Sequence, residues 1–136
     1  MPEAGTRAER GAAYMQTLDP GLEAALRKGM APIAPDFADM MVEFGYGEMM
    51  SRPGLDPKSR QMVTLGALAA LGHPVDQLKG HINGALSVGI TPAEIVEALM
   101  QVALYAGFPA ATNALRVAKR VFTDRGVSPL PLSPSE

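Results

Sequence analysis

The sequence of 136 residues has no cysteine and no tryptophan, and only 19% of its residues are charged. Without cysteine the chain can form no disulfide, use no thiol in catalysis and bind no metal through thiolate. The absence also fits a reducing cytoplasm, the location that we expect. Three tyrosines and four phenylalanines are its only aromatic residues. The core must therefore be built mainly from Ala, Leu, Val and Met, a set that favours helices over strands.

Other classes of protein are disfavoured by what is missing. The net charge of −2 and the lack of a basic patch give no electrostatic case for a nucleic acid or an anionic membrane as partner. No apolar run reaches the roughly 18 residues of a membrane span, and the N-terminal segment lacks the apolar core of a signal peptide. There is no HExxH, GxGxxG, phosphate-loop or GxSxG motif, so we expect no metal and no cofactor.

Proline and glycine divide residues 57–122 into four predicted helices of about four turns each. Proline suits the first turn of a helix, and glycine suits the residue that follows its last turn. Asp56 and Thr91 are predicted N-caps, and Thr91 with Glu94 forms a capping box. Short connections predict antiparallel neighbours. The residues that carry this punctuation are Pro57, Pro74, Pro92 and Pro109, with Gly72, Gly89 and Gly107.

Upstream, we expect a short helix over residues 21–28 and another over 35–44 that resumes after Gly47. Residues 51–55 (SRPGL) predict a turn. We expect one helical domain over residues 1–127, while the Pro- and Ser-rich residues 128–136 predict a disordered tail. Residues 67–71 and 98–106 are apolar on nearly all sides, which predicts burial on more than one side. We therefore expect a homo-oligomer.

His81 lies in the middle of a predicted helix and is the residue type best suited to acid–base work near neutral pH. A hydrogen-bonded structural histidine is the alternative. Thiol chemistry next to it would need cysteines one and two turns earlier, where the chain has Gln77 and Pro74.

Several other side chains are candidates for a site. Gln101 and Tyr105 continue a polar stripe that begins at Glu94 and Glu97, and they either line a cavity or satisfy hydrogen bonds at an interface. Arg52 and Arg60 are close enough in sequence to clamp carboxylates, and a pair of solvated surface arginines is the alternative. Glu48 is a candidate acid, base or arginine partner.

Three segments together resemble the carboxymuconolactone decarboxylase family, in a branch of the alkylhydroperoxidase-like superfamily without CxxC. They are YGEMMSRPGLD with the arginine that follows it, the histidine segment LKGHINGAL and the turn YAGFPAA. The resemblance is best over residues 45–122. It implies an all-α subunit that assembles into a ring-like homohexamer, a trimer of dimers, with a small-molecule site at subunit contacts. Peroxide reduction by a CxxC pair is excluded, because Pro74 and Gln77 occupy its positions.

The resemblance further implies cofactor-free decarboxylation of a small carboxylated lactone, such as 4-carboxymuconolactone, in the catabolism of aromatic compounds. His81 would then be the proton donor, and Arg60 and Glu48 would join it in catalysis. Substrate-binding residues would be Arg52, Gln77, Gln101 and Tyr105. Two alternatives stay open: the same scaffold could catalyse another acid–base reaction, as an isomerase, cyclase or hydrolase, or it could be a non-catalytic oligomer that binds small molecules.

Overall fold

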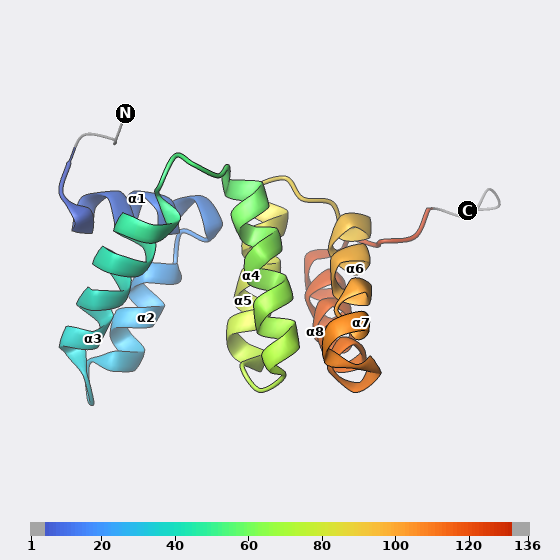
Figure 1. The fold of residues 1–136 in the computed structure, drawn as a ribbon. Helices are drawn as coiled ribbons and strands as arrows, with labels where there is room; N and C mark the ends of the chain where they lie inside the picture. Colours follow the sequence, from blue (N-terminus) through green and yellow to red (C-terminus); the bar gives the residue numbers. More distant parts are fainter. Residues whose placement is uncertain (1–4, 132–136) are drawn as a thin grey trace. The chain divides into compact units, whose positions relative to one another are not determined.

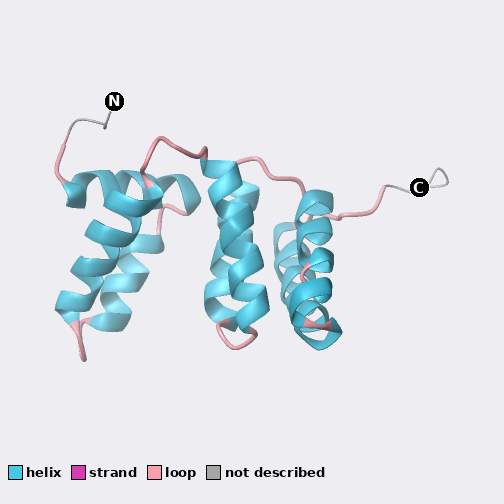
Figure 2. Ribbon diagram, viewed as in Figure 1, coloured by secondary structure: helices cyan, strands magenta, loops and turns pink. Residues whose placement is uncertain are grey.

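The computed structural model describes residues 5–131, and all of its regular elements in that range are helical (Figure 2). In chain order they are α1 (Arg7–Leu18), α2 (Leu22–Met30), α3 (Pro35–Met40), the π-helix η1 (Met41–Met50), α4 (Pro57–Leu71), α5 (Val75–Ser87), α6 (Pro92–Gln101), α7 (Ala103–Ala106) and α8 (Phe108–Arg125) (Figure 1). This confirms the all-α prediction. None of these helices is long and apolar enough to cross a membrane.

The chain forms two compact units that divide between Arg60 and Gln61, near the start of α4. The predicted single domain over residues 1–127 stays a prediction, and so does the ring-like oligomer. Most of the predicted tail, residues 132–136, lies outside the described range.

In the first unit, α1 packs against η1 with no room for side chains at two points. A Cβ on Gly11 of α1 would overlap the carbonyl oxygen of Val42, and a Cβ on Gly47 of η1 would overlap that of Arg7. Only glycine lets the two backbones approach so closely. The contact positions Arg7 and Arg10 beside the C-terminal half of η1.

Two elements of this unit differ from the prediction. We predicted no helix over α1, although Thr6 and Glu9 form a capping box at its start, with the Glu9 amide 3.1 Å from Thr6 Oγ1. The predicted interruption near Gly47 is also wrong, because the helix continues through η1 to Met50 in π geometry. The wider π turn places a different set of side chains on each face than an α-helix would.

The second unit is built from the predicted four-helix pattern, with the third helix divided into α6 and α7. Thr91 and Glu94 form the predicted capping box, and Asp56 Oδ1 accepts from the Ser59 amide at 2.9 Å. Gly72, Gly89 and Gly107 have φ of 81°, 92° and 96°, the region that glycine tolerates best, so the helices end where the sequence predicted.

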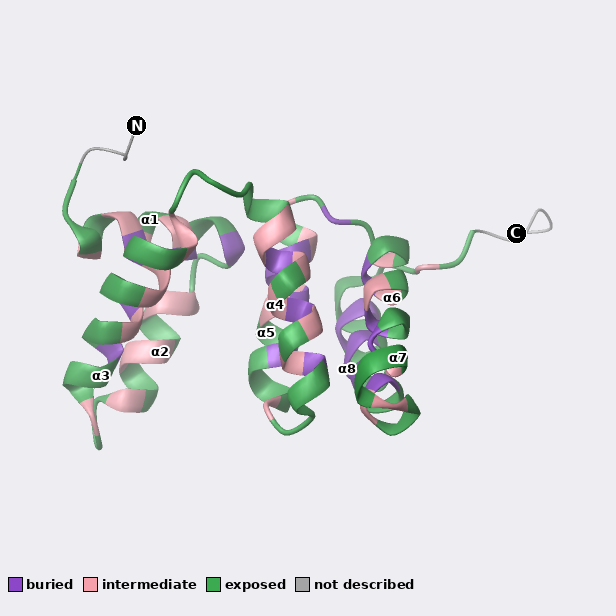
Figure 3. Cartoon of the chain, viewed as in Figure 1, coloured by how far each residue is buried: buried purple, intermediate pink, exposed green. Residues whose placement is uncertain are grey.

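The core of this unit lies between α5, α6 and α8, with Leu65 and Ala69 contributed by α4. Figure 3 shows these buried positions along α5 and α8. Other large apolar side chains remain exposed in the single chain, notably Leu71 at 61% and Leu104 at 79%. The stretches that the sequence predicted to be buried on more than one side therefore keep an uncovered face.

Candidate functional site

His81 is held by a second polar side chain inside the second unit. It projects from the middle of α5, is only partly exposed, and has its Nδ1 3.1 Å from Oε1 of Gln61 in α4. An amide oxygen can only accept a hydrogen bond, so Nδ1 carries the proton in this pair. The neutral ring then has its lone pair on Nε2, the nitrogen left for a ligand or substrate.

Burial lowers the pKa of His81 below its usual value of 6.5, because desolvation disfavours the charged imidazolium. The ring is therefore mainly neutral at neutral pH. An anionic ligand beside the ring would favour the charged imidazolium and so raise the pKa of His81. Protonation of His81 is thus coupled to the charge of what binds there.

Gln61 was missed by the sequence analysis. Its side chain is 0% exposed, and its Nε2 has no hydrogen-bond partner among the described residues. A buried amide nitrogen without a partner is costly, so its presence needs an explanation. One signal was available: Gln61 lies four residues before Leu65 and eight before Ala69, on the helix face that enters the core.

Gln77, one turn before His81 on α5, is exposed to solvent. The side chain that contacts Nδ1 of His81 is Gln61 and not Gln77. The predicted role of Gln77 in substrate binding stays a prediction.

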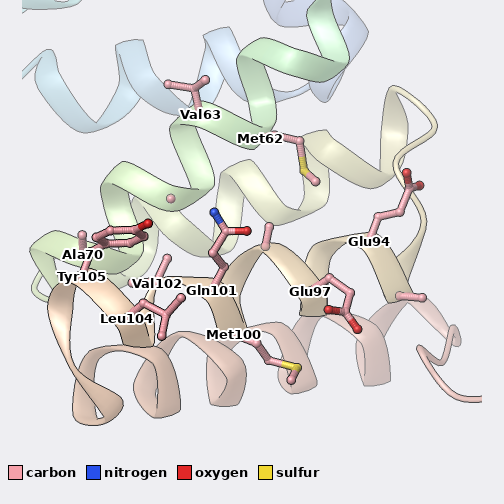
Figure 4. Close-up of a pocket in the computed structure, with 13 residues that line it drawn as sticks. Met62, Val63, Ala70, Glu94, Glu97, Met100, Gln101, Val102, Leu104 and Tyr105 are labelled. Atoms are coloured by element: carbon pink, nitrogen blue, oxygen red, sulfur yellow. The ribbon is translucent and has the colours of Figure 1, made fainter.

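An open groove of ≈ 1030 Å³ lies between α4 and the α6–α7 segment of the second unit (Figure 4). Its α4 wall is apolar and consists of Met62, Val63, Gly66 and Ala70. The opposite wall carries the predicted polar stripe, so the stripe does share one face. Of the two options that the sequence left open, Gln101 and Tyr105 line a groove, with Tyr105 86% exposed. The residues of the stripe are Glu94, Glu97, Gln101 and Tyr105.

The two predicted arginines lie together in the first unit, at the turn that leads into α4. Nη2 of Arg60 donates to the backbone carbonyl of Arg52 at 2.9 Å. Glu48 pairs with Arg7 at 2.5 Å, and both side chains are about half exposed. Glu48 thus has an arginine partner, Arg7, and its predicted acid–base role stays a prediction. Such a surface pair contributes little stability.

In the second unit, His81 contacts Gln61, and Gln101 and Tyr105 line the groove. In the first unit, Arg60 contacts Arg52. Within residues 5–131, no three His, Asp or Glu side chains are grouped so that they could hold a metal ion. The chemistry on which a proposal can rest is therefore that of a neutral, anchored imidazole.

Comparison with known proteins gives the family. The model of the "Carboxymuconolactone decarboxylase family" matches residues 35–120, which begins ten residues before the stretch that the sequence analysis singled out. A 4-carboxymuconolactone decarboxylase of Acinetobacter baylyi is 39% identical over 94 residues, 69% of each chain. An uncharacterized 15.0 kDa protein of Paracoccus denitrificans is 31% identical over 117 residues, 85% of this chain and 87% of the relative. A nitrosuccinic acid decarboxylase of Metarhizium robertsii is 33% identical over 103 residues, 76% of this chain and 71% of the relative. This chain belongs to the carboxymuconolactone decarboxylase family.

Proposed function

We propose that this protein is a cofactor-independent decarboxylase of a small carboxylated lactone such as 4-carboxymuconolactone. The observation that carries the proposal is His81: an imidazole in the family's histidine segment, held at Nδ1 by buried Gln61 and lowered in pKa by its surroundings. The similarity to a 4-carboxymuconolactone decarboxylase supports the choice of substrate.

The reaction needs no external electron sink. When the carbon–carbon bond to the carboxylate breaks, carbon dioxide leaves and the electron pair passes through the conjugated double bond into the lactone carbonyl, giving a dienolate. The dienolate then takes one proton on carbon. The protein has to hold the carboxylates, stabilise the oxyanion and supply that proton.

His81 supplies the proton from Nε2 in this proposal. The bound substrate is an anion, and its charge favours the imidazolium that burial alone disfavours. Nδ1–H donates to Gln61 in both protonation states, so the ring keeps one orientation while Nε2 gains and loses its proton. Gln61 is therefore a positioning residue.

The other predicted residues complete the proposal. Arg52 and Arg60 hold substrate carboxylates, since guanidinium groups match carboxylate geometry. Gln101 or Tyr105 donates a hydrogen bond to the oxyanion, and Gln77 contacts the substrate. Glu48 is a candidate acid or base. If it gains or loses a proton during catalysis, the pH dependence of kcat/KM should differ between Glu48→Gln and wild type.

A second candidate substrate is a small acid with a nitro group beside the carboxylate. The similarity to a nitrosuccinic acid decarboxylase favours it. Loss of carbon dioxide would leave the electron pair in the nitro group as a nitronate, so no cofactor would be needed here either. The same imidazole would then deliver a proton to carbon.

Carbon dioxide release from each of the two substrates tests the proposal. We expect turnover of one of them by the wild-type protein and a loss of about 100-fold or more in His81→Gln, because a positioned acid contributes about that factor. His73→Gln is the matched control, since His73 is the chain's other histidine and is exposed. Failure of both substrates, or equal rates in wild type and His81→Gln, would overturn the proposal.

We also propose the homohexamer, a trimer of dimers, as the working form in a cytoplasmic pathway of aromatic catabolism. The uncovered apolar side chains Leu104, Tyr105 and Phe108 support an oligomer, because large exposed apolar patches commonly mark contact surfaces. Light scattering at micromolar concentration tests it, and a monomer there would contradict it.

A further inference from the structure

The first unit contains a cavity of ≈ 420 Å³. It lies among α1, the C-terminal end of η1 and the turn of residues 51–57, and all of its lining residues belong to this unit. Its volume falls in the range of about 300–1,000 Å³ that is typical of small-molecule sites. The lining combines apolar side chains with two arginines, Arg10 and Arg52.

The Arg10 guanidinium is held in place by two hydrogen bonds to neutral backbone groups. Its Nε donates to the Gly47 carbonyl at 3.1 Å, and its Nη1 donates to the Gly5 carbonyl at 2.6 Å. Both acceptors are neutral. Among residues 5–131, no carboxylate forms an ion pair with Arg10 or Arg52.

One acid, Asp56, also lines the cavity, but its carboxylate is already engaged. It accepts from the Ser59 amide at 2.9 Å and from the Ser59 hydroxyl at 2.8 Å, and these bonds lower the pKa of Asp56. The lining of the cavity therefore includes two guanidinium groups and one carboxylate, so its net charge is positive. Anions are favoured there over neutral or cationic ligands.

The rest of the wall suits an apolar body. The Tyr14 side chain lies in the wall and its ring is 6.1 Å from that of Tyr46, centroid to centroid. Leu55, Met50 and Pro53 add apolar surface. An apolar cavity with a few convergent polar groups is what binds small organic acids.

We propose that this cavity is a binding site for a small carboxylate with an apolar body, in which Arg52 and Arg10 receive the carboxylate and Tyr14 and Leu55 contact the body. The inference concerns binding alone and so does not depend on decarboxylation. It deepens the role proposed for Arg52 by naming the cavity that this arginine serves. The bound acid is either the substrate or a separate effector, and the test distinguishes the two.

Benzoate is the probe, and its neutral analogue benzamide is the control for charge. Calorimetric titration into the full-length His81→Ala protein separates binding from turnover. We expect saturable binding of benzoate, with benzamide at least about tenfold weaker, because a hydrogen bond to a charged group is worth that factor or more. Arg52→Gln should weaken benzoate by a similar factor, whereas Lys28→Gln, an exposed cation of the same unit, should leave it unchanged.

A second pair of variants guards against misfolding. Leu55→Glu adds a negative charge at a partly exposed wall position and should abolish benzoate binding, while Leu71→Glu on exposed α4 surface should not. Benzoate that raises KM alone in the turnover assay identifies the substrate's own carboxylate as the occupant, and benzoate that lowers kcat identifies a separate acid. Equal binding of benzoate and benzamide, or equal affinity in Arg52→Gln and Lys28→Gln, would overturn the proposal. Binding that persists when neither substrate is decarboxylated would leave this site standing and remove only the proposed function.

Discussion

Replacing Gln61 by methionine should separate stability from activity. Methionine has a similar length but no polar group, so two opposing changes follow. The unpartnered Nε2 of Gln61 disappears from the core, which removes a penalty of about 1–3 kcal/mol. Nδ1–H of His81 loses its acceptor at 3.1 Å, which costs up to a similar amount. Because the His81 ring is only partly buried, water can replace part of that bond.

The two changes nearly cancel, so we expect the free energy of unfolding of Gln61→Met to lie within about 1 kcal/mol of wild type. Chemical denaturation measures it, with Gln16→Met on exposed α1 surface as the matched control. Decarboxylation should nevertheless fall about 10- to 100-fold, since the ring is no longer held in one orientation.

Nitrogen NMR of the imidazole supplies the direct readout. In a His73→Gln background the chain has a single histidine, so its ring signals belong to His81. Wild-type Gln61 should give the tautomer protonated at Nδ1, and Gln61→Met should give a mixture. A loss of more than about 3 kcal/mol, full activity, or an unchanged tautomer in Gln61→Met would each contradict the role assigned to Gln61.

Three further predictions concern other parts of the chain. If His81 donates the proton, its protonated form is the active one, so kcat/KM should fall as pH rises through a pKa below 6.5; a rise with pH would make His81 a base. Gly47→Ala should destabilise the protein by about 1–3 kcal/mol or more, because its Cβ would overlap the Arg7 carbonyl. Gly45→Ala is the control, because the space around Gly45 is open and no loss of stability is expected. Equal melting temperatures of the two variants would refute the close packing. Thr91→Ala should cost about 1 kcal/mol in thermal unfolding by removing the α6 cap, and no change would show that the capping box is unimportant.

Much of the second unit was predictable because its signals are local. A proline in the first turn, a threonine with a glutamate three residues later, and a glycine at a helix end each act through hydrogen bonds or backbone angles within one turn. These signals placed α5, α6 and α8 within a few residues of where they lie. The same kind of signal was present at Thr6 and Glu9, so α1 was predictable and was missed.

The sequence by itself determined the all-helical fold, the family resemblance and the candidate His81. Only the tertiary structure decided which distant residues are in contact. Gln61 and His81 are 20 residues apart, and their pairing depends on how α4 packs on α5. The fit of Gly11 and Gly47 depends on the path of η1 against α1, whose π geometry no local motif announces. The position of the Arg10 guanidinium likewise depends in part on the distant carbonyl of Gly47, to which its Nε donates. Contacts between distant segments depend on the packing of whole helices, which the local preferences of residues do not specify.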